Sequence, residues 1–313
     1  MGYSARYHAA SLAAVFLALG IGILIGSVFG DDLVRDTQKG LESSLRGNLD
    51  SARDRADDLA SELGRSDEFA ERAYPAIVGT ELEGERVGVL EGDRVGVLAL
   101  GGLPDDLAGD IEAALGPAEG RLVEVAVVRE PPDLESLDSE LAETRFAGLA
   151  DEGDMLEAFS KGVGRQLVLG GPLLDRVRGQ LLSRASGSFG ALDGLIVVRD
   201  QPANLDGEDR SATSALEAGI LDAATATRIP VVGVEREDSD PSSIGFLSSH
   251  GLSTVDDLDA VAGWVAMVFA LLGAEGNFGV KETADSLLPD LLAPVESGPP
   301  TRPPRPPGRG PGG

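Results

Sequence analysis

Histidine and cysteine, the side chains that most often supply metal ligands and nucleophiles, are almost absent from this sequence. It has no cysteine and two histidines, His8 and His250. Thiolate chemistry and cysteine-based metal sites are therefore excluded. Three acidic residues follow His250 closely in the chain: Asp256, Asp257 and Asp259. One imidazole beside carboxylates suits Cu(II) or Zn(II) weakly and Cu(I) poorly, so His250 is a weak metal candidate and a loop histidine without ligands is the favoured interpretation.

Motifs for catalysis are also missing. The sequence contains no G-x-S-x-G elbow, and two distant histidines cannot form an H-E-x-x-H zinc site. The acidic pairs Asp105-Asp106 and Asp256-Asp257 stand where helices are expected to begin, and carboxylates there are stabilised by the helix dipole. Ser253 or Thr254 is predicted to cap the second of these helices. The sequence therefore predicts no enzyme, no catalytic residues and no cofactor site.

Two glycine-rich turns are the remaining candidates for binding. "LALGGLP" (98–104) and "LVLGGPLL" (167–174) each place two glycines after an apolar run and a proline where a helix is expected to start. Ligands of open α/β sheets bind at the carboxyl ends of strands, so both turns are candidate binding loops. Neither matches a phosphate-binding fingerprint, and purely structural turns are the favoured interpretation.

The elements around these turns predict an α/β fold. Apolar runs rich in β-branched residues alternate with helical patterns, which is typical of a doubly wound, mostly parallel sheet covered on both faces. Strands are predicted at 94–100, 121–128, 165–170, 194–198 and 230–234. Helices are predicted at 104–116, 134–162 (with a break left open), 172–186, 210–228 and 255–272. The α/β domain is assigned to 75–292, and the Pro/Gly-rich tail 293–313 is predicted to be disordered.

Ahead of this domain, Ala9–Phe29 contains no charged residue. Twenty-one residues at 1.5 Å each span roughly 31 Å, which matches the hydrocarbon core of a bilayer. A transmembrane helix is therefore predicted at 9–30, with residues 1–8 in the cytoplasm and the rest outside the cell membrane. A cleaved signal peptide is the alternative. Three glycines at G-x-x-x-G spacing are candidates for pairing two such helices: Gly22, Gly26 and Gly30.

The charged segment 31–72 is predicted to be a coiled-coil stalk. Six apolar residues repeat in the 4-3-4-3-4 rhythm of such a helix and define what we call the seam: Leu45, Leu49, Ala52, Ala56, Leu59 and Leu63. Two alanines make the seam narrow, and Gly40, Gly47 and Gly64 weaken the helix by about 1 kcal/mol each. The seam pairs with a second copy or a helical partner in one interpretation; in the other it packs on the protein's own domain.

Charge limits the classes of partner. The chain carries a formal net charge of −27, which argues against nucleic acid or an anionic lipid surface as a partner of the acidic part. Homo-oligomerisation or a coiled-coil protein partner is expected instead, and a membrane is expected as the anchor.

Two segments also resemble a known family. "HAASLAAVFLALGIGILIGS" (8–27) resembles the N-terminal span of the actinobacterial MctB family of copper transport outer membrane proteins. "LSTVDDLDAVAGWVAMVFALLG" (252–273) and "NFGVKETADSLLP" (277–289) resemble that family's C-terminal block. The resemblance implies a cell-envelope protein with a role in copper efflux or homeostasis, copper as a bound metal, and an outer-membrane location as an alternative to the cell membrane.

Two hypotheses about function follow. The first is copper efflux or homeostasis, as the resemblance implies. The second is a non-catalytic envelope scaffold that recruits or regulates a partner, for example in cell-wall or cell-separation machinery, through its stalk and α/β domain. The ligand set favours the second, since Cu(I) prefers thiolate, thioether and imidazole. Besides Met1, the thioethers are Met155 and Met267.

Overall fold

The computed structural model describes residues 5–82, 85–151, 153–188, 190–202 and 204–290. The chain divides into two compact units between Glu68 and Phe69. The predicted disordered tail at 293–313 lies outside the described residues, as do residues 1–4 of the predicted cytoplasmic segment.

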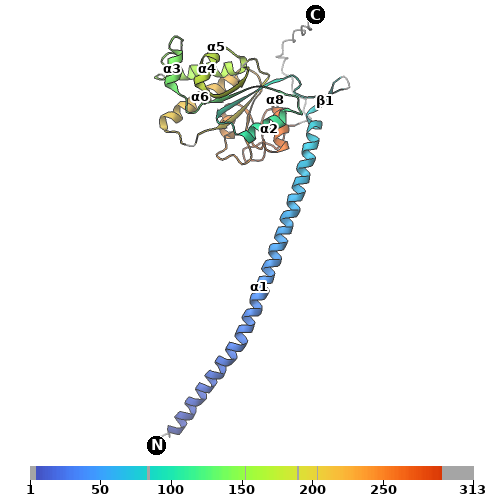
Figure 1. Cartoon of the computed structure of the whole chain (residues 1–313), viewed down its shortest axis with the longest axis vertical. Coiled ribbons are helices and arrows are strands. Elements are labelled where there is room, and N and C mark those ends of the chain that lie inside the picture. The colour runs from blue at the N-terminus through green and yellow to red at the C-terminus, as the bar shows by residue number, and fades with distance from the viewer. Residues whose placement is uncertain (1–4, 83–84, 152, 189, 203, 291–313) are drawn as a thin grey trace. The chain divides into compact units, whose positions relative to one another are not determined.

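The first unit is helical. Helix α1 (Ala5–Ile77) is 73 residues long and unbroken, so Gly30, Gly40, Gly47 and Gly64 neither end nor interrupt it (Figure 1). Its last residues belong to the second unit, where the Tyr74 ring packs edge-on against Trp264 with centroids 5.5 Å apart.

The predicted transmembrane helix at 9–30 is wrong. Nowhere in the described part of the chain does a helix have both the length and the apolar character needed to cross a membrane. The apolar residues are the beginning of α1, and this helix continues without a break into a segment dominated by charged residues. The part of the fold-class prediction that placed a separate membrane helix before a stalk is therefore corrected to one continuous helix.

The second unit is α/β, as the alternating pattern predicts. Its main sheet has, among the described residues, seven strands in the order β5-β4-β3-β6-β7-β8-β9. Every neighbouring pair is parallel except β4 with β5, which is antiparallel. These strands are β3 (Arg94–Gly101), β4 (Arg121–Val128), β5 (Leu182–Gly187), β6 (Gly194–Asp200), β7 (Val231–Val234), β8 (Ser253–Val255) and β9 (Asn277–Phe278).

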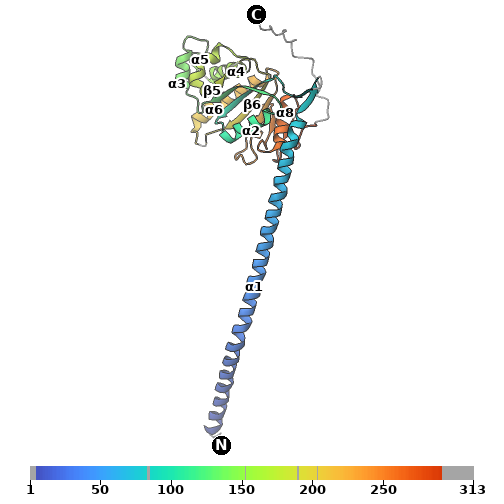
Figure 2. The same cartoon turned by 45° about the vertical axis from the view of Figure 1, so that its right-hand side comes forward.

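Helices cover both faces of this sheet (Figure 2). One buried cluster joins the sheet to α3 (Leu134–Leu141), α4 (Gly153–Leu169), α5 (Pro172–Leu181) and α6 (Gly207–Thr225). The opposite cluster joins it to α2 (Asp105–Leu115), α8 (Val261–Leu271) and the end of α1. Strand β3 shows why both faces are buried: Leu98 and Leu100 enter the first cluster while Val97 enters the second. Helix α7 (Ile244–Ser249) lies between β7 and β8 in the chain.

Several predicted elements differ from the structure. The predicted strand at 165–170 is the end of α4, because Leu156, Phe159, Val163 and Leu167 are buried at helical rather than alternating spacing. The predicted helix at 172–186 ends at Leu181, and the edge strand β5 follows directly.

The repeated pentapeptide "RVGVL" falls in two different sheets. Its first copy contributes to β2 (Glu85–Gly88), which pairs with β1 (Gly79–Leu82) in a separate two-stranded sheet. Its second copy begins β3 of the main sheet.

Candidate functional site

Acidic residues gather at the carboxyl ends of the parallel strands. One carboxylate lies at or within two residues of the end of each of four strands: Glu130 after β4, Asp200 in β6, Glu235 after β7 and Asp256 after β8. Because these strands are parallel, the four residues lie along one edge of the sheet, where ligands of open α/β folds bind. Their position directly after "AVVR", "IVVR", "VGV" and "STV" is a signal in the sequence that pattern analysis missed.

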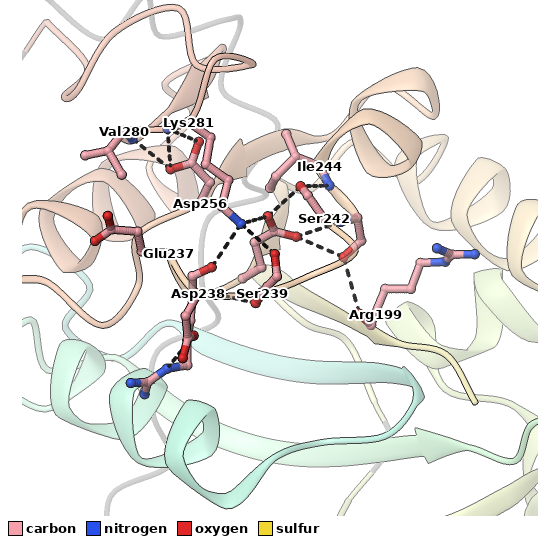
Figure 3. A network of polar contacts seen from close by, with 12 residues as sticks. Arg199, Glu237, Asp238, Ser239, Ser242, Ile244, Asp256, Val280 and Lys281 are labelled. Atoms are coloured by element: carbon pink, nitrogen blue, oxygen red, sulfur yellow. Dashed lines mark hydrogen bonds and ion pairs between the residues drawn. The ribbon is translucent and has the colours of Figure 1, made fainter. Parts of the chain in front are cut away.

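Glu235 belongs to a satisfied polar network that also includes Ser242 and Lys281, both labelled in Figure 3. Its carboxylate is buried, at 4% exposure. It accepts hydrogen bonds from Ser242 Oγ at 2.6 Å and from the Ser243 backbone N–H at 2.7 Å, and it pairs with Lys281 Nζ at 2.5 Å. The same ammonium group donates to the carbonyl oxygens of Arg236 and Ser239. With all its partners supplied by the chain, this network holds loops together and leaves Glu235 no oxygen for a ligand.

Asp256 holds the same segment from the next strand. Its carboxylate accepts the backbone N–H groups of Val280, at 2.7 Å, and Lys281. Gly279, with φ 132°, passes so close that a Cβ there would meet Asp256 Oδ1. Only glycine fits this approach. The "NFGVK" sequence therefore folds as a strap that ties β9 and Lys281 to the carboxyl ends of β7 and β8.

Asp256 and Asp257 do not stand at a helix start, and neither Ser253 nor Thr254 caps α8, contrary to prediction. Residues 253–255 form β8, and α8 begins only at Val261 without a side-chain cap. Asp257 is instead buried, with neither carboxylate oxygen hydrogen-bonded to a described residue. Burial, followed by the nearby charges of Asp256 and Asp259, raises the pKa of Asp257 to about 6. The other acidic pair is confirmed, since Asp105 and Asp106 lie in the first turn of α2.

The connections of the sheet reverse direction at β3 and β6, and the "LALGGLP" turn lies there. Gly101 and Gly102 pass against Asp200 so closely that an added Cβ would collide with it, and Gly101 also borders Glu130. Both carboxylate oxygens of Glu130 are buried without a hydrogen-bond partner among the described residues. Burial first, and then the charge of Glu217, raise the pKa of Glu130 to about 8. The second turn, "LVLGGPLL", follows a helix and so lies at no strand end.

A buried ion pair supports this point of the sheet. Arg199 Nε lies 2.7 Å from Glu217 Oε1 and its Nη2 lies 3.1 Å from Oε2, a two-pronged contact with a fully buried carboxylate. Gln201 donates to the same carboxylate, and the Arg199 guanidinium stacks on the Phe246 ring at 4.1 Å. The residues around the switch point are therefore acids and their structural partners.

The weak metal candidate, His250, is paired with a carboxylate of α6. His250 Nδ1 lies 2.7 Å from Asp222 Oδ1 in α6, and its ring packs on Phe246. Strand β8 separates it from the acidic residues that follow in the chain. Met267 is fully buried, and Met155 packs against the core. Among the described residues, no three histidine, cysteine, aspartate or glutamate side chains are grouped so that they could hold a metal ion.

The residues predicted to pair helices lie along α1. Leu49, Leu59 and Leu63 are 50%, 65% and 67% exposed, and Ala52 and Ala56 are exposed beside them. Leu45 and Gly30 have side-chain positions outside the described residues. Apart from the adjoining backbone of α1, no atom of the described residues lies within 4 Å of a Cβ built on Gly22 or Gly26.

A comparison with protein families gives one match of nearly full length. The family model described as "Copper transport outer membrane protein, MctB" matches residues 3–289. No curated protein matches the chain. The matched range includes both α1 and the α/β unit, and its end at 289 contains the strap formed by "NFGVK".

Proposed function

Because the chain belongs to the MctB family of copper transport outer membrane proteins, we propose that it serves copper transport at the cell envelope as a non-catalytic association module. In this role it joins protein chains together and does not itself ligate the copper that is moved. The family description supports the link to copper and to the envelope. The choice of an association role rests on the donor atoms of the chain and on the exposed seam of α1.

The donor atoms do not suit Cu(I). This ion prefers thiolate, thioether and imidazole ligands, at least two of which must converge. The chain has no thiol. Met267 is enclosed in the core, and the single imidazole of the α/β unit is bound to Asp222. Oxygen ligands along the sheet edge are hard donors, and two of these carboxylates, Glu235 and Asp256, already accept hydrogen bonds from the chain.

The exposed seam is the observation that carries the association role. Leu49, Leu59 and Leu63 each leave half or more of their surface in contact with solvent, at spacings that put them on one face of α1. Burying one leucine side chain is worth about 1.5–3 kcal/mol. In a single chain these leucines stay exposed, whereas a second helix packed along the seam would bury them.

We take a second copy of this chain as the occupant. When two identical helices lie parallel and in register, each layer of the seam meets its own kind, so the narrow Ala52 and Ala56 layers face each other and the leucine layers do likewise. Positions next to the seam residues carry charges of both signs. Arg46, Arg53 and Arg55 are basic, and Glu62, further along the helix, is acidic. Exposed ion pairs of this kind contribute little to the stability of the paired helices, so we expect most of the stability to come from the leucine layers.

The test is complementation of a strain that lacks the gene. Leu49→Asp together with Leu59→Asp places two charges in the seam and should abolish self-association in sedimentation velocity and resistance to copper in growth. Ser51→Asp together with Ser61→Asp adds the same charge away from the seam and should preserve both. The copper role fails if the deletion strain is no more sensitive to copper than its parent. The association role fails if the seam variant sediments and complements like the parent protein, and a defect in cell shape or separation alone would favour the scaffold without copper.

A further inference from the structure

Basic side chains gather at one hollow of this acidic protein. A hollow of about 770 Å³ lies between the carboxyl-terminal half of α4 and the end of α6, and we call it the α4–α6 hollow. Its lining includes four basic residues and one acidic residue: Arg145, Lys161, Arg165, Arg228 and Asp222. The whole chain has 26 basic and 53 acidic residues, so the sign of the local charge is opposite to that of the protein.

Three of the four basic groups have no acidic partner. Lys161 pairs with Glu157 along α4. By contrast, Arg145, Arg165 and Arg228 form no ion pair with any described residue, and the Arg145 guanidinium lies over the face of the Phe146 ring, 4.7 Å from its centroid. The single lining carboxylate, Asp222, is bound to His250. The unneutralised charge in the hollow is therefore that of three guanidinium groups.

The remaining charges do not cancel these three. The carboxyl ends of α4 and α6 lie at the hollow and carry about half a negative charge each. The carboxylate of Asp222 adds one full negative charge. Charges elsewhere on the protein are screened over roughly 8 Å at physiological ionic strength, so the net charge of −27 acts only weakly at this place.

Rigid packing fixes the positions of the basic groups. A Cβ on Gly164 of α4 would collide with the Ile220 backbone of α6, and one on Gly219 would collide with Ser160. Glycine at these positions lets the two helices touch. Lys161 and Arg165 are one turn apart on α4, and Arg228 follows α6 in a left-handed conformation, φ 67°.

We propose that the α4–α6 hollow binds a phosphate-bearing ligand. Guanidinium groups match the oxygens of a phosphate in two-pronged contacts, which a carboxylate-rich surface could not offer. The volume lies within the range of about 300–1,000 Å³ found for small-molecule sites. Small apolar side chains line the floor, and Leu169 is 47% exposed there. A free phosphate compound and the headgroup of an anionic phospholipid share this chemistry.

Two probes separate these sources. The full chain is titrated with inorganic tripolyphosphate in a calorimeter, and in parallel mixed with phosphatidylcholine vesicles that contain or lack phosphatidylglycerol. We expect saturable binding to at least one probe. Binding of tripolyphosphate would indicate a free phosphate compound as the ligand, and binding of only the anionic vesicles would indicate a phospholipid headgroup. Arg165→Gln and Arg228→Gln should each weaken binding about tenfold, since each removes a charged hydrogen-bond donor.

Arg121→Gln is the matched control. Arg121 is also exposed, forms no ion pair with a described residue, and lies at the start of β4, outside the lining of the hollow. Its removal should leave binding unchanged. Thermal unfolding of each variant checks that it folds. The proposal is overturned if neither probe binds. It is also overturned if Arg165→Gln and Arg228→Gln bind as tightly as the Arg121→Gln control, because any vesicle binding would then occur through another basic segment of the chain.

Discussion

The ammonium group of Lys281 lies 2.5 Å from the carboxylate of Glu235, although the two residues are 46 positions apart in the chain. Strand β7 ends just before Glu235, and Lys281 follows β9 in the strap. The pair therefore joins the middle of the sheet to its last strand. A second ion pair, between Lys161 and Glu157, has the same 2.5 Å distance between Nζ and Oε1 but is exposed on α4. Comparing the two pairs therefore isolates the effect of burial.

Removing Lys281 should destabilise the protein strongly. Lys281→Ala leaves the buried Glu235 charge with only hydroxyl and backbone donors, and breaking a buried pair in this way typically costs about 3–5 kcal/mol. Lys161→Ala breaks an exposed pair and should change stability too little to resolve. Chemical denaturation of both variants measures the difference. Equal effects would show that the strap contributes no more than a surface contact.

Arg199→Lys should also destabilise, although it keeps the charge. Lysine cannot make the two-pronged contact with Glu217 or stack on Phe246 as the planar guanidinium does, so we expect a loss of about 1–3 kcal/mol. Arg121→Lys, at an exposed position, is the comparison. Denaturant midpoints that agree between these two variants would contradict the structural role of the guanidinium.

Stability should fall as the pH rises from acid to neutral. Burial raises the pKa of Glu124 from its usual 4.5 to about 7, and one of its oxygens has no partner among the described residues. Between these two values the folded protein holds a proton that the unfolded chain has lost, so the free energy of unfolding decreases from about pH 4.5 to about pH 7. Glu124→Gln removes the titration and should reduce this fall by about 3 kcal/mol. A fall of the same size in the variant would exclude Glu124 as its source.

Copper should bind only weakly. Titration calorimetry of the purified chain should show no tight stoichiometric binding of Cu(I) or Cu(II), because soft donors do not converge. His250→Ala should leave the titration unchanged, since the imidazole is bound to Asp222. Submicromolar binding that disappears in His250→Ala would overturn this expectation and identify His250 as a ligand.

A single introduced cysteine tests the pairing of the seam. The natural sequence has none, so Ala52→Cys supplies the only thiol. In two parallel helices in register these thiols face each other, and mild oxidation should yield a disulfide-linked dimer. Asp54→Cys, on the opposite face of α1, should remain monomeric under the same conditions. Equal yields from both variants would indicate random collision instead of a seam.

The sequence alone predicted those parts of the fold whose signals are local. Four of the five predicted strands, at 94–100, 121–128, 194–198 and 230–234, correspond to β3, β4, β6 and β7. Each combines β-branched residues with a turn at its end, and such a run favours a buried strand wherever it lies. The alternation with helices then required parallel pairing. For the candidate site, the sequence indicated its edge of the sheet through the "LALGGLP" turn.

Only the tertiary structure decided the elements and contacts that depend on distant partners. The run at 165–170 became helix because Gly164 lets α4 pack directly on α6. Residues 253–255 became a strand because β7 and β9 lie on either side, and this displaced the predicted cap. The Glu235–Lys281 pair likewise joins separate elements, and the α4–α6 hollow gathers arginines that form no ion pair among the described residues. A local sequence pattern predicts which face of a segment is buried. It does not predict which side chain from a distant part of the chain will form an ion pair with a charged residue of that segment.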